Sequence, residues 1–262
     1  MPSPGLPLTT QSERLPLSAS IKETHARISP YGLREGENCV SSALLANGPT
    51  CLSDRSLAEF DRIALTTSFP EGAVLLVEGQ VPRGVYVLCQ GRVKLMTTSR
   101  DGRTIITRIA QRGETLGSGS VLTSRPYELT IETLQPSQLA FIDSAAFLRF
   151  IKERADACLH VARQLSNECQ TAYDVIRLVG AHTVQQKLAR LLLQWSADGR
   201  VAEGSIPLRI SLTHEEVAQL IGSTRETVTR TLGELKKRRV LELTGTTLLI
   251  LDNAALEALA EA

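Results

Sequence analysis

Two cationic side chains and one carboxylate lie close together near the C-terminal end of this chain, at Arg225, Glu226 and Arg230. An arginine can bind O6 and N7 of guanine with two hydrogen bonds, and a glutamate can accept a hydrogen bond from N4 of cytosine. Thr229 adds a hydroxyl and a methyl group, which suit the same kind of surface. The four residues therefore predict a surface that reads base pairs in the major groove of DNA.

Hydroxyl and imidazole side chains surround this group. We expect five of them to meet DNA phosphates, because hydroxyls and helix N-termini are frequent phosphate ligands. They are Thr213, His214, Ser223, Thr224 and Thr227. Such contacts position a protein on DNA without reading its sequence.

Two short helices are expected to position these residues. Thr213 with Glu216, and Ser223 with Glu226, both have the spacing of a capping box, which starts a helix. Gly222 between them suits a turn with positive φ, so residues 213–237 are predicted to form a helix-turn-helix whose second helix projects outward. A small residue at the crossing and five apolar residues supply the predicted shared core: Ala218, Val217, Leu220, Ile221, Val228 and Leu232.

The flanking sequence extends this motif. Residues 240–243 and 247–251 form a predicted strand pair, and a strand pair after two such helices is typical of a winged helix. From Arg209 to Arg239, seven Arg and Lys face four Glu, whereas the whole chain has a net charge of only +1. Nucleic acid binding would therefore depend on a local basic patch rather than on the total charge.

A different pattern covers residues 66–142. Short apolar runs rich in β-branched residues alternate with glycines, as sandwiches, barrels and rolls do. The runs are 74–77, 85–88, 93–95, 104–107, 129–131 and 138–142.

None of the chain's histidines, at 25, 160, 182 and 214, falls in this region, which argues against a cupin-like metalloenzyme. A P-loop, a nucleophile elbow and a His-Glu-x-x-His motif are also absent, so we expect no enzyme.

Between these regions, seven residues recur at alternating spacings of four and three, which is a heptad seam. They are Cys158, Ala162, Leu165, Cys169, Ala172, Ile176 and Val179. Several are small, which suits close approach of two helices. We expect this helix to form a dimer interface; the alternative is that the seam packs on the chain's own strand domain.

The N-terminal region has weak apolar periodicity and holds six of the eleven prolines within its first 50 residues. We interpret it as flexible, apart from a short helical pattern at residues 53–63.

Five cysteines at 39, 51, 89, 158 and 169 form no disulfide framework and indicate reduced thiols. Neither a secretory signal nor a membrane-spanning run is visible, so we expect a cytoplasmic protein without membrane contact.

Taken together, residues 55–255 resemble the CRP/FNR family of transcription regulators. The resemblance rests on the glycine-punctuated strands, the heptad helix and Ser223-Thr-Arg-Glu-Thr-Val-Thr-Arg230, which is similar to a recognition helix of the catabolite activator type. It implies an α+β fold with a cyclic-nucleotide-binding-type β-roll, a long dimerisation helix and a C-terminal winged helix-turn-helix. The expected domains are a flexible N-terminal extension (1–52), the β-roll effector-type domain (53–152), the dimerisation helix (153–180) and the DNA-binding domain (181–262).

The resemblance also implies partners. A homodimer would bind a TGTGA-like palindrome in double-stranded DNA, with Arg225, Glu226 and Arg230 reading each half-site. RNA polymerase is the further expected partner. Whether the protein activates or represses transcription depends on promoter geometry.

The effector site departs from the family pattern. The cyclic AMP site of the family has Gly-Glu-Leu, whose Glu meets the ribose, and Arg-Ser, which hold the phosphate. Here the corresponding segments are Gly117-Ser118-Gly119 and Tyr127-Glu128, and a carboxylate at that place would repel an anionic nucleotide. We expect no control by cyclic AMP. Candidates for a pocket that binds some other, unidentified small molecule are Gly117, Ser118, Arg125, Tyr127 and Glu128.

An iron–sulfur oxygen sensor is the alternative within the family. Such a cluster needs four ligands, normally thiolates. The N-terminal region offers only Cys39 and Cys51, the counterpart of the fourth ligand is Ser137, and Cys89 is expected in a strand core. We therefore predict no metal or other cofactor.

Overall fold

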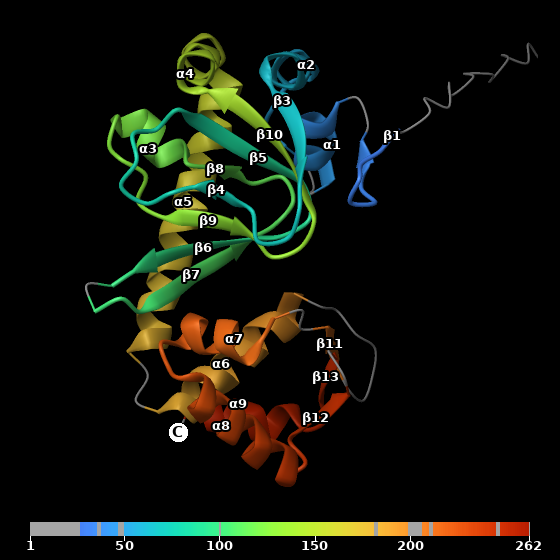
Figure 1. Cartoon of the computed structure of the whole chain (residues 1–262), viewed down its shortest axis with the longest axis vertical. Helices are drawn as coiled ribbons and strands as arrows, with labels where there is room; N and C mark the ends of the chain where they lie inside the picture. The colour runs from blue at the N-terminus through green and yellow to red at the C-terminus, as the bar shows by residue number, and fades with distance from the viewer. Residues whose placement is uncertain are drawn as a thin grey trace, which may run out of the picture.

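Figure 1 shows a computed structural model with a strand domain above, a long helix along its side and a mainly helical domain below. The structure describes residues 27–35, 38–46, 50–99, 101–180, 183–198, 206–209, 212–244 and 247–261. Within these ranges, no helix is both long and apolar enough to cross a membrane. The α+β class and the predicted order of the parts agree with this architecture.

The strand domain is a roll of two antiparallel four-stranded sheets. One sheet has the order β3 (Leu65–Phe69), β10 (Ser137–Asp143), β5 (Gly84–Gln90) and β8 (Thr115–Leu116). The other has the order β4 (Val74–Leu76), β9 (Thr130–Thr133), β6 (Val93–Thr98) and β7 (Thr104–Ala110). Side chains of both sheets, among them Leu88, Leu139 and Ile131, share one buried cluster. The alternation of apolar residues predicted from the sequence therefore builds the inside of the roll.

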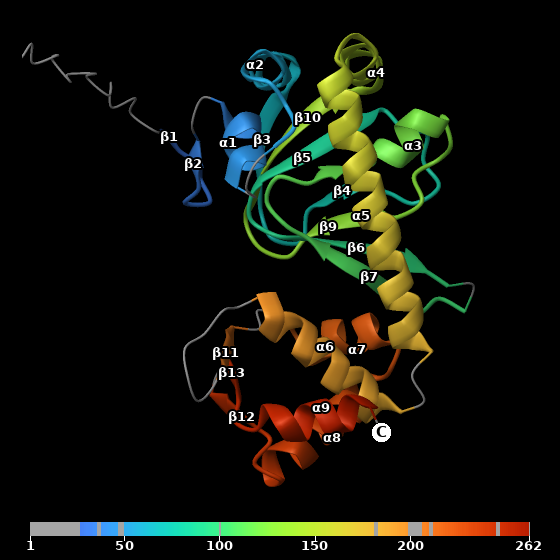
Figure 2. The ribbon, with the colours of Figure 1, turned by 180° about the vertical axis from the view of Figure 1, so that it is seen from behind.

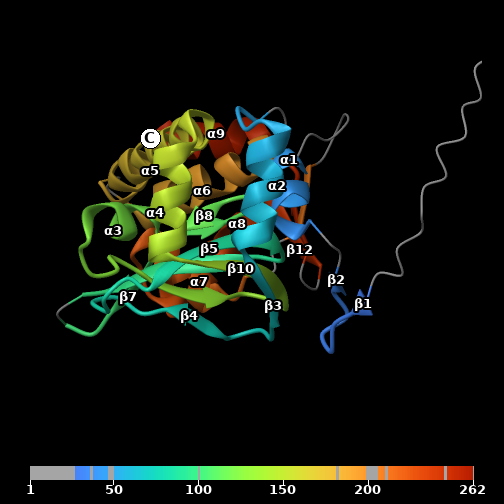
Figure 3. The ribbon, with the colours of Figure 1, turned by 90° about the horizontal axis from the view of Figure 1, so that it is seen from above.

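Helices α2 (Asp54–Ile63) and α4 (Ser144–Glu153) cover the outer face of the β3–β10–β5 sheet, as Figure 3 shows from above. Phe60 of α2 and Phe150 of α4 stack there with their ring centroids 4.7 Å apart. Each helix starts at a side-chain cap, Ser53 for α2 and Asp143 for α4. A short helix, α3 (Ser118–Thr123), follows β8.

Part of the N-terminal segment belongs to the roll, which corrects the expectation of a flexible extension over residues 1–52. Helix α1 (Cys39–Ala46) buries Val40, Ala43 and Leu44 in the same cluster as Phe60. Asp61 of α2 accepts hydrogen bonds from the backbone amides of Val40 and Ser41. These apolar positions are too few for a clear periodicity, and only the sheet surface beneath them creates the burial. A small hairpin, β1 (Arg27–Ile28) and β2 (Arg34–Glu35), precedes α1, and residues 1–26 lie outside the described ranges.

A disulfide joins Cys39 at the start of α1 to Cys89 in β5, across 50 residues of sequence, with the two Cα atoms 5.8 Å apart. This pairing differs from the expectation of reduced thiols. Cys89 is 1% exposed, so its predicted place in a strand core is confirmed. Spacing alone could not reveal the bond, because the sheet brings the two residues together. Cys51, Cys158 and Cys169 are free.

Helix α5 (Ala155–Val179) runs from the roll to the lower domain, as Figure 2 shows from behind. Ala157 and Val161 are the positions that it buries against the roll. The heptad seam lies one residue further on and faces away from the roll. Its exposed residues are Cys158, Ala162, Cys169, Ala172 and Ile176. Leu165 is half-buried, and the side chain of Val179 is not among those described. The seam is therefore open for contact with another molecule, and the alternative that it packs wholly on its own roll is not observed.

The lower domain, which we call the head, contains α6 (Val184–Asp198), α7 (His214–Ile221), α8 (Arg225–Lys237) and α9 (Asn253–Glu261). A small sheet with the order β11 (Ile206–Arg209), β13 (Thr247–Ile250) and β12 (Leu241–Thr244) forms the wing. Ile106 of β7 is buried within the hydrophobic cluster of the head, so the roll and the head pack directly on each other.

Candidate DNA-binding interface

The start of α7 has the predicted capping box. The Thr213 hydroxyl accepts a hydrogen bond from the Glu216 amide at 3.2 Å, and the Glu216 carboxylate accepts one from the Thr213 amide at 2.9 Å. Gly222 ends the helix with φ 62°, and the amide of Ser223 bonds to the carbonyl of Ala218 at 2.8 Å. The left-handed turn therefore lies where the sequence indicated, and α7 and α8 pack across it.

The start of α8 differs by one residue from the prediction. Thr224, not Ser223, is the N-cap, and its hydroxyl accepts a hydrogen bond from the amide of Thr227 at 3.3 Å. Ser223 is taken up in the turn after Gly222, so the capping box predicted from Ser223 and Glu226 does not form. The carboxylate of Glu226 is consequently free of a capping role.

The predicted core of the helix pair is confirmed. All five apolar residues and the small residue at the crossing are buried: Val217, Ala218, Leu220, Ile221, Val228 and Leu232. This packing fixes which side of α8 faces outward.

That outward side carries the predicted base-reading residues. Arg225, Glu226, Thr229 and Arg230 are all exposed, and α8 lies on the far side of the head from the roll (Figure 1). Within the described part of the chain, the side chains of Arg225, Glu226 and Arg230 make no hydrogen bond or ion pair. Their charged groups are therefore available to a ligand that approaches α8.

The predicted phosphate-binding residues lie around this surface. Thr213 and Thr224 are exposed, and His214, Ser223 and Thr227 are half-buried. Most of their polar groups already have local partners. The hydroxyls of Thr224 and Thr227 are 3.0 Å apart, and Nδ1 of His214 lies 2.9 Å from Oγ1 of Thr229. The exposed ends of α7 and α8 thus present hydroxyls in fixed positions.

The candidate effector residues do not all come together. Tyr127 is 5% exposed, and its hydroxyl donates to the Gly84 carbonyl at 2.6 Å while accepting from the Gly84 amide at 3.2 Å. A Cβ atom on Gly117, where φ is 84°, would come within 3.0 Å of the Tyr127 ring, so these two positions are in close contact. Arg125 and Glu128, in contrast, are exposed.

The fifth candidate, Ser118, is also buried. It is 2% exposed, and its hydroxyl has no hydrogen-bond partner among the described residues. Of the two buried candidate hydroxyls, that of Tyr127 is bonded to the backbone and that of Ser118 is not.

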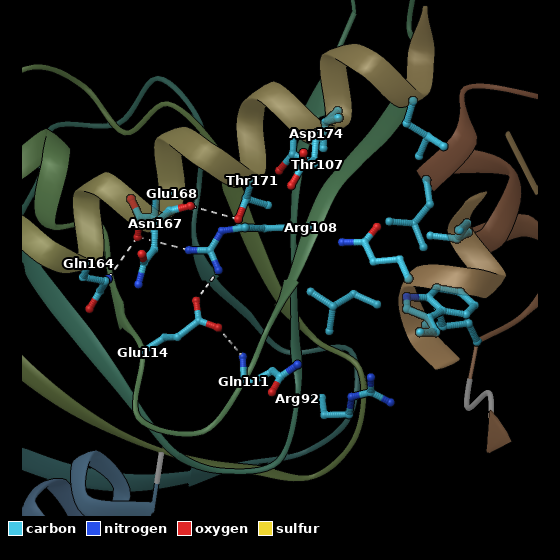
Figure 4. Close-up of a pocket in the computed structure, with 18 residues that line it drawn as sticks. Arg92, Thr107, Arg108, Gln111, Glu114, Gln164, Asn167, Glu168, Thr171 and Asp174 are labelled. Atoms are coloured by element: carbon cyan, nitrogen blue, oxygen red, sulfur yellow. Dashed lines mark hydrogen bonds and ion pairs between the residues drawn. The ribbon is translucent and has the colours of Figure 1, made fainter. Parts of the chain in front are cut away.

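A cavity of about 470 Å³ lies elsewhere, between β7, α5, α6 and α7 (Figure 4), and none of the five candidate effector residues lines it. On its wall, Arg108 donates hydrogen bonds to Glu114 and, at 3.1 Å, to Glu168. Gln164 donates to Glu168 at 3.0 Å and accepts from the Thr115 amide at 3.0 Å. Burial raises the pKa of Glu168 above its ordinary value of 4.5. Sequence reasoning missed this network because its members come from separate elements.

Metal ligation finds little support in the donor set. Among the described residues, no three His, Cys, Asp or Glu side chains lie close enough to hold a metal ion. Cys39, one of the two N-terminal thiols, is joined to Cys89. These residues do not fit the four-ligand requirement of an iron–sulfur cluster.

Comparison with known proteins agrees with this architecture. Residues 66–154 match the family described as the cyclic nucleotide-binding domain, and residues 186–259 match the Crp-like helix-turn-helix domain. A CRP-like cAMP-activated global transcriptional regulator of Mycobacterium tuberculosis is 27% identical over 190 residues, which cover 72% of this chain and 84% of that protein. The nitrogen fixation regulation protein FixK of Bradyrhizobium diazoefficiens is 27% identical over 207 residues, covering 78% and 85%.

Solved structures show the same fold. FixK2 of Bradyrhizobium japonicum has a TM-score of 0.67 at 20% identity, covering 76% of this chain and 98% of its own. A CRP/FNR-family transcriptional regulator of Thermus thermophilus has a TM-score of 0.58 at 26% identity, covering 76% and 99%.

The exposed second helix of a helix-turn-helix, joined to a cyclic-nucleotide-binding-type roll, defines a DNA-binding transcription regulator. The two family matches together span more than half of the chain, and the chain belongs to the CRP/FNR family. Its relatives are regulators, which confirms the prediction that the protein is not an enzyme.

Proposed function

We propose that this regulator binds a TGTGA-like palindrome as a homodimer and that Arg225, Glu226, Thr229 and Arg230 read each half-site. The observation that carries the proposal is the exposure of these side chains on the outer face of α8. Two arginines flanking a carboxylate match guanine and cytosine edges in adjacent base pairs. Thr213, His214, Ser223, Thr224 and Thr227 would meet the phosphates on both sides of the groove.

The dimer part of the proposal follows from α5. Its seam is exposed, and Ile176 on that seam is 66% exposed although it is a large apolar side chain. A heptad seam of this kind is usually buried against a second helix. Tyr173, three residues earlier on the same helix, is also 54% exposed. A second copy of α5 would cover both residues and place two recognition helices about 34 Å apart in successive major grooves.

Independence from cyclic AMP is supported by the candidate effector region. Tyr127 stands where the family resemblance expects the phosphate-binding arginine, and its hydroxyl is bonded to the backbone of Gly84. Glu128 adds a negative charge to this segment, which would repel a cyclic phosphate. The relatives that are named as cAMP-activated are therefore a guide to the fold of this chain, but not to the small molecule that controls it.

The remaining parts of the proposal concern organisation and partners. A roll over residues 53–152, a dimerisation helix over 153–180 and a DNA-binding domain over 181–262 would act as the functional units, with α1 added to the roll. RNA polymerase is the proposed protein partner, and the cytoplasm is the proposed location because the proposed target is DNA.

Fluorescence anisotropy with the full-length protein tests the proposal. A labelled duplex with a TGTGA palindrome should bind roughly a thousandfold more tightly at physiological salt than a scrambled duplex of the same composition. Equal binding of both duplexes would overturn the assignment of the half-site. In a second titration, cyclic AMP should leave the affinity for the palindrome unchanged. A marked increase would refute independence from the nucleotide while leaving the DNA site intact.

A further inference from the structure

One ion pair connects the roll to the head among the described residues. The ammonium group of Lys94, in β6, lies 2.9 Å from Glu132 of β9 and 3.3 Å from Glu216 of α7. The three side chains are 13%, 23% and 15% exposed, in that order. A single cation is therefore shared, away from most of the solvent, between the second sheet of the roll and the first helix of the helix-turn-helix.

The contact involves the residue that starts α7. One carboxylate oxygen of Glu216 accepts from the amide and the hydroxyl of Thr213, at 2.9 and 3.1 Å, and the other oxygen contacts Lys94. Lys94 thereby holds the end of α7 that carries Thr213 and His214, both expected to meet phosphates.

Apolar contacts surround this ion pair. Ile106 is fully buried in the hydrophobic cluster of the head, and Met96 and Ile109 pack against the same cluster. Apolar burial holds surfaces together but has little directional preference. A hydrogen-bonded ion pair at the same contact adds directional preference, because it is satisfied in only one arrangement of the two partners.

The charge of Lys94 is maintained in this setting. Burial on its own would lower the pKa of Lys94, but hydrogen bonds and charges from Glu132 and Glu216 raise it above its ordinary value of 10.5. The ammonium therefore stays protonated at physiological pH.

We propose that Lys94 is a positioning residue for DNA binding. By holding Glu216 it sets the angle of the head on the roll, and in a dimer this angle sets the separation and direction of the two recognition helices. The inference rests on the proposed function, since it needs two heads that bind one palindrome together. It predicts that Lys94 matters more for a full palindrome than for a single half-site.

The test uses full-length Lys94→Met, Glu216→Gln and the double variant, with Lys152→Met as the control because Lys152 is an exposed lysine of the same roll. Glutamine can still close the capping box, so Glu216→Gln removes the charge and keeps the helix start. Lys94→Met and Glu216→Gln should each weaken binding to the palindrome roughly tenfold, a typical size for coupling between parts of a protein. The control, Lys152→Met, should not. The double variant should be no weaker than either single one, and Lys94→Arg should restore most of the affinity.

Two further readouts separate positioning from a purely structural role. Binding to a duplex with one half-site should change less than about twofold, which is within the usual effect of an altered surface charge. The wild-type protein should discriminate against palindromes whose half-sites are moved by one base pair, and Lys94→Met should lose much of that discrimination. Circular dichroism melting checks that each variant is folded. If Lys94→Met is not folded, the palindrome and the single half-site are compared with Glu216→Gln and Lys94→Arg instead.

Wild-type affinity and spacing preference retained in Lys94→Met and Glu216→Gln would overturn the inference, as would an equal loss on the single half-site. Failure of the wild-type protein to prefer the palindrome would instead overturn the proposed function, so the two failures are distinguishable.

Discussion

Nδ1 of His214 and Oγ1 of Thr229 are 2.9 Å apart, which ties the first helix of the helix-turn-helix to the second at the surface that faces outward. The same Thr229 hydroxyl donates to the carbonyl of Arg225 at 2.8 Å. Because a hydroxyl has one hydrogen, it must accept from His214, whose Nδ1 therefore carries the proton. The donor of Thr229 is used inside the protein, and its methyl group remains to meet a base.

This assignment gives a first prediction for Thr229. In Thr229→Val the methyl group is kept and the hydroxyl is lost, so preference for a thymine at the contacted position should persist. In Thr229→Ser the hydroxyl is kept and the methyl group is lost, so that preference should fall. Binding to a set of half-sites with each base at every position measures both. A larger loss of base preference in the valine variant would show that the hydroxyl, not the methyl group, reads the DNA.

A second prediction concerns Arg230. Arg230→Ala should cost about 1–3 kcal/mol of binding free energy and relax specificity at one guanine. Arg238→Ala is the matched control, because Arg238 is an exposed arginine at the other end of α8. It should weaken binding evenly across sequences, if at all. Even weakening by Arg230→Ala would mark that residue as a phosphate contact instead.

A third prediction tests the seam of α5. Ile176→Asp places a charge on the exposed seam and should shift the protein toward monomers, since a buried, unpaired carboxylate is costly at a helix–helix interface. Gln170→Asp changes an exposed position off the seam of the same helix and should leave the association unchanged. Sedimentation velocity at several concentrations measures the difference. Unaltered association of Ile176→Asp would remove the seam from the interface.

A fourth prediction follows from Asp156, whose carboxylate links the start of α5 to the N-cap of α2. The amide and hydroxyl of Ser53 donate to it at 2.8 and 2.7 Å, and the hydroxyl of Ser56 donates at 3.0 Å. Hydrogen bonds from Ser53, and then from Ser56, hold the pKa of Asp156 well below its ordinary value of 3.8.

A carboxyl group whose pKa is lower in the folded protein than in the unfolded chain stabilises the fold. This contribution is complete when the pH is above the pKa of the unfolded chain, 3.8 for Asp156. It is lost as the pH falls from 3.8 toward the pKa of the folded protein. Asp156→Asn should therefore reduce the free energy of unfolding near neutral pH by roughly 1 kcal/mol, because the group is screened by solvent. It should also flatten the decline in stability below pH 3.8. Urea unfolding across pH measures both, and an undiminished acid-induced decline in the variant would contradict this role.

A fifth prediction concerns the disulfide. The denatured, unreduced protein should show three reactive thiols, those of Cys51, Cys158 and Cys169. Cys89→Ala should add one, because Cys39 loses its partner. The variant should also be less stable by about 2–4 kcal/mol, since a cross-link restricts the unfolded chain. Titration with a thiol reagent provides the count, and five reactive thiols in the wild-type protein would restore the expectation of reduced cysteines.

Much of the DNA-binding surface could be predicted because its determinants are close in sequence. A capping box depends on two residues three positions apart, here Thr213 and Glu216, and the turn depends on Gly222 alone. The helical repeat explains the spacing of the apolar residues Val217, Ile221 and Val228. The N-cap of α8 was misplaced by one residue, since Ser223 and Thr224 can both cap and only the hydrogen bond from Ser223 to Ala218 decides between them.

The sequence by itself therefore determined the helix pair, the exposed seam of α5 and the residues on the outer face of α8, because local spacing sets which side of a helix is apolar. Only the tertiary structure decided that α1 belongs to the roll, that Cys39 meets Cys89 and that Lys94 holds Glu216. These contacts join residues 50 and more than 100 positions apart. No local pattern encodes such pairs, since the folding of the sheets and the docking of the head determine which side chains meet.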